Sequence, residues 1–98
     1  MARMGRRMHP GRVLREEYME PMRLDALGLA QALGVAPWQI ARVIDNEWPM
    51  SSDLALRLAR CFNTSPQFWL GLQTAYDLSM AQAEFGAEIE ARVQPLAA

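Results

Sequence analysis

The 98-residue sequence has no lysine, one cysteine, one histidine and no long apolar run. A single cysteine excludes an internal disulfide framework and is typical of a cytoplasmic protein. A membrane-spanning helix needs about eighteen or more consecutive apolar residues, so we expect no membrane partner. The basic first residues lead into no apolar segment, which argues against a secretion signal. These absences favour a small cytoplasmic protein with a single core.

Residues that carry catalysis or bind metal ions are scarce. His9 has no cysteine or carboxylate partner at catalytic or metal-ligand spacing. Gly28 stands alone within a predicted helix, so the sequence contains no glycine-rich phosphate loop. Asp45 and Glu47 flank a loop, but two carboxylates are weak evidence for a cation site. We therefore expect no enzymatic activity, cofactor or metal, and we expect Cys61, which has apolar neighbours, to be an inert thiol of the core.

The sequence is rich in apolar residues at helical spacing. Apolar residues make up 51% of the chain, and they recur at three- and four-residue intervals with no alternating strand pattern. We predict an all-α fold of five to six short helices. Their expected ranges are 10–19, 26–33, 37–45 and 52–62, followed by a helix that begins at Pro66 and a last helix over 79–93.

The stretch 25–50 predicts a helix-turn-helix motif. Asp25 is a suitable N-cap for the first helix, and Gly34 supplies the left-handed residue that commonly ends one. Pro37 suits the first turn of the second helix, where Ile40 and Val43 form an apolar face. The second helix of such a motif usually enters a DNA major groove.

Charge and apolar residues divide the chain into three parts. Residues 1–8 are expected to form a flexible basic arm, because five arginines precede the first acidic residue. Residues 9–78 form the expected DNA-binding domain, and residues 79–98 form a C-terminal helical extension. Phe85, Ile89 and Val93 recur at four-residue spacing in this extension. The narrow stripe either packs on the chain's own core or, as we expect, forms a homodimer contact, because operator-binding proteins of this type are usually two-fold dimers.

Three segments carry a family resemblance: HPGRVLREEYMEPM, LAQALGV and SSDLALRLARCFNTSPQFWLGLQTAYDL. They resemble the HigA-type antitoxins of bacterial toxin–antitoxin systems over about residues 9–78, and the third segment is the most specific. The resemblance implies a repressor-like (lambda/434-type) fold of the XRE helix-turn-helix family. It also implies a homodimer that binds palindromic operator DNA to repress its own operon. A RelE/HigB-like ribonuclease toxin is the implied protein partner.

In this class, bases are read from the start of the first motif helix and the exposed face of the second. The matching positions in this sequence are Ala26, Ala36, Pro37, Trp38, Gln39 and Arg42. Arg42 is suited to guanine, and Gln39 to adenine or a phosphate. Arg23, Asn46 and Ser51 are further expected DNA contacts near the backbone.

Two features depart from the family pattern. Trp38 stands where relatives often have a polar residue, and the loop Asp45-Asn46-Glu47-Trp48 is acidic where relatives tend to be basic. Negative charge beside DNA opposes a binding energy that is mainly electrostatic. The sequence therefore leaves two alternatives open. Beside the expected operator-binding antitoxin, these are an antitoxin-like protein-binding module with weak or lost DNA binding, and a stand-alone helix-turn-helix transcriptional regulator.

Overall fold

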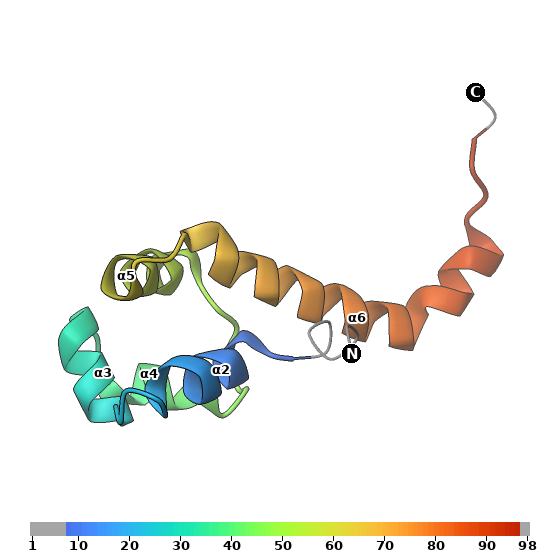
Figure 1. Ribbon diagram of the computed structural model, residues 1–98. Coiled ribbons are helices and arrows are strands. Elements are labelled where there is room, and N and C mark those ends of the chain that lie inside the picture. The colour runs from blue at the N-terminus through green and yellow to red at the C-terminus, as the bar shows by residue number, and fades with distance from the viewer. Residues whose placement is uncertain (1–7, 97–98) are drawn as a thin grey trace.

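The computed structural model describes residues 8–96, which fold into helices joined by short loops (Figure 1). The elements are the α-helices α2 (Pro10–Val13), α3 (Ala26–Leu33), α4 (Pro37–Ile44), α5 (Ser52–Phe62) and α6 (Pro66–Arg92), together with η1 (Leu14–Met19), a π-helical segment that continues α2. Residues 8–96 contain no strand, and the predicted all-α class is confirmed. Most of the predicted arm, residues 1–7, lies outside the described part, whereas Met8 packs against the core.

The predicted caps determine where the helices begin and end. The Asp25 carboxylate accepts from the Gly28 amide at 2.8 Å and starts α3. Gly34 ends that helix at φ 73°, a left-handed conformation that costs glycine little. The Ser51 and Ser65 hydroxyls accept from amides in the first turns of α5 and α6. Each cap satisfies a backbone donor that its helix leaves unpaired.

The core is centred on Trp69, the largest fully buried side chain. Its ring lies 5.0 Å from that of Tyr18, and its Nε1 donates to the Thr64 hydroxyl at 2.9 Å. Burial of an indole is favourable when its N–H finds a partner, as it does here. The helix-turn-helix residues Leu29, Ala30, Leu33, Ile40 and Val43 complete the packing beneath α3 and α4.

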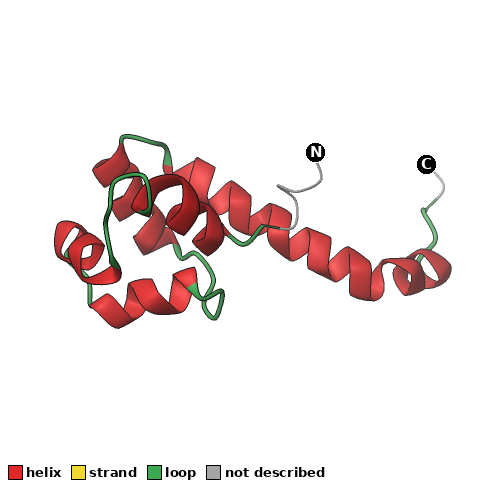
Figure 2. Ribbon diagram, turned by 60° about the horizontal axis from the view of Figure 1, so that its bottom comes forward, coloured by secondary structure: helices red, strands yellow, loops and turns green. Residues whose placement is uncertain are grey.

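The two helices predicted at the C-terminal end are one continuous helix, α6, from Pro66 to Arg92. The expected interruption near residue 79 is absent because the segment 77–80, Asp-Leu-Ser-Met, contains no proline or glycine to end the helix. The first part of α6 packs on α2 and α5, while its later part projects from the core and changes direction near its end (Figures 1 and 2). The molecule is therefore elongated, with principal extents of 53 × 25 × 24 Å.

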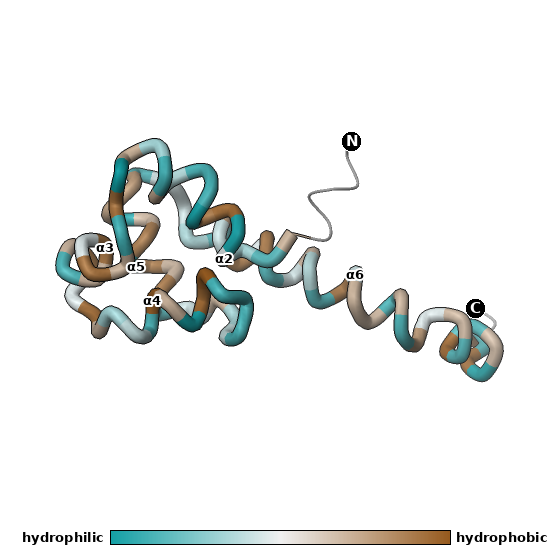
Figure 3. Tube along the Cα trace, turned by 90° about the horizontal axis from the view of Figure 1, so that it is seen from below, coloured by the Kyte–Doolittle hydropathy of each residue, from teal (hydrophilic) through white to brown (hydrophobic). Residues whose placement is uncertain are grey.

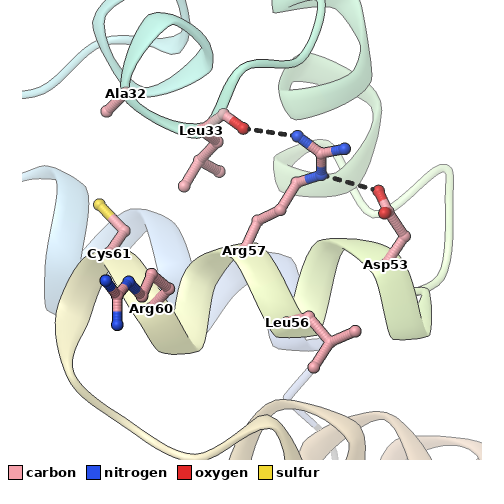
Figure 4. Close-up of a pocket in the computed structure, with 7 residues that line it drawn as sticks. All are labelled: Ala32, Leu33, Asp53, Leu56, Arg57, Arg60 and Cys61. Atoms are coloured by element: carbon pink, nitrogen blue, oxygen red, sulfur yellow. Dashed lines mark hydrogen bonds and ion pairs between the residues drawn. The ribbon is translucent and has the colours of Figure 1, made fainter.

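Cys61 is exposed, so its prediction as a core thiol was wrong. The buried face of α5 is formed by Leu54, Ala55, Leu58 and Ala59, and Cys61 lies outside that face. Figure 4 shows it beside Arg60 at an open pocket between α3 and α5. Arg57 spans the same pocket and donates to the Leu33 carbonyl at 2.8 Å, so its role here is to hold the end of α3.

Gly11 allows the start of α2 to approach the end of α4 closely. A Cβ atom placed on Gly11 would lie 1.8 Å from the Val43 carbonyl oxygen and 3.0 Å from the Ile44 Cα. These neighbours are backbone atoms, which cannot rotate away as a side chain can. The close approach keeps α4 against the core, so that the opposite face of α4 is directed outward.

We expect Gly11→Ala to destabilise the protein by about 1–3 kcal/mol or more, because it overfills a packed contact. Gly71→Ala is the matched control, since a Cβ there meets nothing within 4 Å. The control should be neutral or stabilising by up to about 1 kcal/mol, the helix preference of alanine over glycine. Urea denaturation measures both variants, and equal stability of the two would contradict the close approach.

A buried polar cluster joins α2, α6 and the loop after α4. Gln73, on α6, accepts from the Met50 amide and donates to the Asp77 carboxylate at 2.6 and 2.9 Å. His9 is buried, accepts from the Gly11 amide through Nδ1 at 2.9 Å, and meets the Tyr76 ring edge-on at 5.0 Å. The sequence pattern did not identify this cluster, because its members are far apart in the chain.

Burial lowers the pKa of His9, and this effect exceeds the opposite effects of the Asp77 charge and the Trp48 backbone. The unfolded chain therefore binds a proton at a higher pH than the folded chain. The contribution of this lowered pKa to the free energy of unfolding is fully present above the unfolded-chain pKa of about 6.5, and it is lost as the pH falls below that value.

We expect His9→Asn to flatten the pH dependence of stability between about pH 7.5 and pH 5, near and below the ordinary histidine pKa. Asparagine keeps an N-cap acceptor for Gly11 but does not titrate. Urea unfolding at a series of pH values measures the difference between the two proteins. Parallel curves for the wild type and His9→Asn would show that this histidine does not contribute to the acid sensitivity.

Candidate nucleic-acid interface

The outer face of α4 is the most distinctive exposed surface of the helix-turn-helix. Ile40 and Val43 on its inner face are buried, while Trp38 and Arg42 point outward. Trp38 is 54% exposed, an unusually high fraction for so large an apolar side chain. The arrangement directs an indole and a guanidinium away from the core, as a groove-binding helix requires.

The other sequence-predicted contacts surround α4. Ala26 begins α3, Ala36 is the N-cap of α4 and Pro37 is its first residue. Arg23 and Asn46 are exposed turn residues with φ of 57° and 63°. Ser51 precedes α5, and its hydroxyl accepts from the Leu54 amide at 3.1 Å. The predicted residues thus lie at the starts of the two motif helices and in the turns beside them.

Gln39 is partly committed to the structure of α4. Its Oε1 accepts from the Ala36 amide at 3.0 Å, and the side chain is half-buried. The interaction satisfies one of the unpaired donors at the start of the helix. The amide nitrogen is then the part of Gln39 that is best placed to contact an outside group.

Arg42 lies between a carboxylate and an indole ring. Its Nε is 3.9 Å from Glu47 Oε1, and its guanidinium carbon is 5.7 Å from the centre of the Trp48 ring. Trp48 in turn meets Trp38 edge-on, with 5.2 Å between ring centres. The sequence analysis named these residues separately but missed their cluster, because the loop after α4 breaks the helical spacing that would have linked them.

The loop after α4 folds back onto the end of that helix. The amides of Glu47 and Trp48 both donate to the Arg42 carbonyl, at 2.9 and 3.2 Å. Asn46 adopts a left-handed conformation that allows this reversal. The loop, hydrophilic along most of its length in Figure 3, therefore places Glu47 beside Arg42 on the outer face of α4.

The later part of α6 exposes a row of apolar side chains along one face. Phe85 and Ile89, both predicted for a dimer contact, are 47% and 54% exposed. Ile89 also lines a shallow groove of about 330 Å³ with Leu78 and Gly86. Val93 is exposed but lies just beyond the end of α6 in extended backbone, so it does not continue the helical stripe.

Other kinds of site have no support within the described residues. Residues 8–96 contain no group of three or more side chains arranged to hold a metal ion. In this same part of the chain, no helix combines the length and apolar character that crossing a membrane requires.

Comparison with known proteins identifies helix-turn-helix relatives, although no family model matches the sequence. Virulence-associated protein I of Dichelobacter nodosus is 48% identical over 77 residues, which span 79% of this chain and 71% of the relative. Antitoxin GraA in complex with its operator is 46% identical, with a TM-score of 0.87 over 93% of this chain and 92% of GraA.

A second solved structure is the antitoxin HigA of Pseudomonas aeruginosa with the higBA promoter. It is 37% identical to this chain, and the TM-score is 0.89 over 93% of this chain and 99% of that one. The similarity to both solved structures extends over the helix-turn-helix and most of α6. It therefore confirms the predicted repressor-like architecture across almost the whole described chain.

Proposed function

The chain belongs to the HigA-type antitoxin family of helix-turn-helix proteins, and we propose that it binds operator DNA and represses its own operon. The observation that carries the proposal is the outward face of α4, with Arg42 at its centre. Relatives solved with operator or promoter DNA support the same assignment. Such a function places the protein in the cytoplasm and requires neither a catalytic site nor a cofactor.

In the proposed complex, α4 enters the major groove and Arg42 contacts a guanine. An arginine can donate two parallel hydrogen bonds to guanine O6 and N7, which makes it the commonest base-specific contact. Gln39 contributes mainly through its amide nitrogen, because its oxygen already accepts from Ala36. Trp38 supplies apolar contact to thymine methyl groups or sugars. The backbone amides near Ala26 and Ser51, with Arg23 and Asn46, lie toward the phosphates.

We also propose that the protein acts as a homodimer through the later part of α6. Exposed Phe85 and Ile89 lie on a helix that extends away from the core, where a second copy can cover them. Val93, exposed just beyond the end of α6, is included in the proposed contact although it lies off the helical stripe. A two-fold dimer would present two α4 helices to a palindromic operator.

Neutralisation of a RelE/HigB-like ribonuclease toxin is the further function that family membership supports.

A second candidate function is a protein-binding module with weak or lost DNA binding. The exposed pair Trp38 and Trp48 favours it, because tryptophan is enriched at the centres of protein interfaces. The acidic loop also favours it, since Asp45 and Glu47 oppose contact with phosphates. DNA binding separates the two candidates.

We expect Arg42→Ala to reduce the preference for the operator over random DNA by about tenfold to a hundredfold, as lost guanine contacts typically do. The probe is the DNA upstream of the protein's own gene, measured by fluorescence anisotropy at several salt concentrations. Arg92→Ala is the control, because Arg92 is an exposed arginine at the far end of α6. Wild-type binding that is equally tight to both DNAs at every salt would refute repression and favour the protein-binding module.

For the dimer, we expect Phe85→Glu combined with Ile89→Glu to yield a monomer in light scattering, because charges replace the apolar contact. Ala83→Glu with Ala87→Glu has the same spacing on the opposite, exposed face of α6 and should leave the dimer intact. A dimeric mass for the first variant would place the interface elsewhere.

A further inference from the structure

We propose that Glu47 is a specificity-determining residue, which holds Arg42 away from phosphates and so weakens binding to DNA without an operator. The inference rests on the proposed function of α4 and assigns a role to a loop residue outside the expected contacts. Its structural basis is the arrangement of Arg42 between the Glu47 carboxylate and the Trp48 ring.

Glu47 and Trp48 contact the guanidinium of Arg42 at Nε and over the guanidinium carbon, and not at its terminal nitrogens. Glu47 approaches Nε, while the guanidinium carbon lies over the ring of Trp48, 5.7 Å from its centre. Within residues 8–96, no hydrogen bond is recorded for the two terminal nitrogens of Arg42. Because these nitrogens form the fork that contacts guanine, Arg42 can approach a base while Nε stays beside Glu47.

The support for Arg42 is itself held in place. Trp48 contacts Trp38 on α4, and its amide donates to the Arg42 carbonyl at 3.2 Å. Two residues later, the Met50 amide is bonded to buried Gln73. These contacts hold the backbone of the loop against the end of α4, so that Glu47 follows Arg42 at a short distance in space.

Binding to random DNA depends mainly on the number of positive charges that neutralise phosphates. Glu47 offsets the charge of Arg42 and adds its own repulsion, so this part of α4 contributes little to such binding. At an operator, the directed hydrogen bonds to guanine compensate for that repulsion. The carboxylate therefore weakens binding to random DNA more than binding to an operator, because only on random DNA is a phosphate the alternative partner of Arg42.

Glu47→Gln tests the proposal, because it removes the charge and keeps the shape of the side chain. We expect affinity for random DNA to rise about threefold to fivefold more than affinity for the operator, as loss of one exposed charge pair permits. The salt dependence of random-DNA binding should steepen by about 0.9 in log–log slope, the value for one additional phosphate contact. Anisotropy titrations with operator and random duplexes measure both quantities.

Asp45→Asn is the matched control, because Asp45 is an exposed carboxylate of the same loop that forms no recorded ion pair with Arg42. It should raise both affinities equally and preserve their ratio. An equal ratio for Glu47→Gln and Asp45→Asn would overturn the proposal and leave only a general charge effect. In an Arg42→Ala background, Glu47→Gln should raise both affinities equally, because only the direct repulsion between Glu47 and phosphates is then removed. A preferential gain of random-DNA affinity that persists in this background would overturn the role of Arg42. A wild-type protein without operator preference would instead overturn the proposed function, and this inference with it.

Discussion

The hydrogen bond from the Met50 amide to the Gln73 side chain holds together the parts of the molecule that matter for function. It is buried, so breaking it would leave polar groups without partners, at a cost of about 1–3 kcal/mol. It ties the end of the loop after α4 to the stretch of α6 that contacts His9 through Tyr76. The bond therefore fixes the end of the acidic loop against the core, while the Glu47 and Trp48 amides fix its start on the Arg42 carbonyl.

Helix α6 has two roles, one in each half of its length. Near its start, Trp69 and Gln73 lie within the core and set the positions of α5 and the loop. Farther along, Phe85 and Ile89 are exposed on a part of the helix that extends from the core. Because these two parts are continuous, a dimer formed by the exposed part would fix the relative orientation of the two α4 helices. Dimer geometry and operator spacing would thereby be linked through one continuous helix.

On sequence alone, the acidic loop simply opposes DNA binding. In the structure, its two carboxylates differ in their relation to Arg42. Asp45 and Glu47 carry equal charges, but only Glu47 is paired with Arg42 among the described residues. One arginine on a reading face with an adjacent carboxylate can discriminate by hydrogen-bond geometry better than an unopposed positive charge can. The exposed indoles add apolar contact area without adding attraction to phosphates.

Local sequence determined the helices and their ends, because caps such as Asp25, Gly34 and Ser51 act on backbone groups within a few residues. It also determined the apolar faces of α3 and α4, which follow from spacing along one helix. The tertiary structure decided what depends on distant residues or on a segment's surroundings. It exposed Cys61, buried His9 against Tyr76 and brought Glu47 and two indoles around Arg42. Periodicity describes which side of one helix is apolar, but only packing and loop geometry decide which surfaces meet.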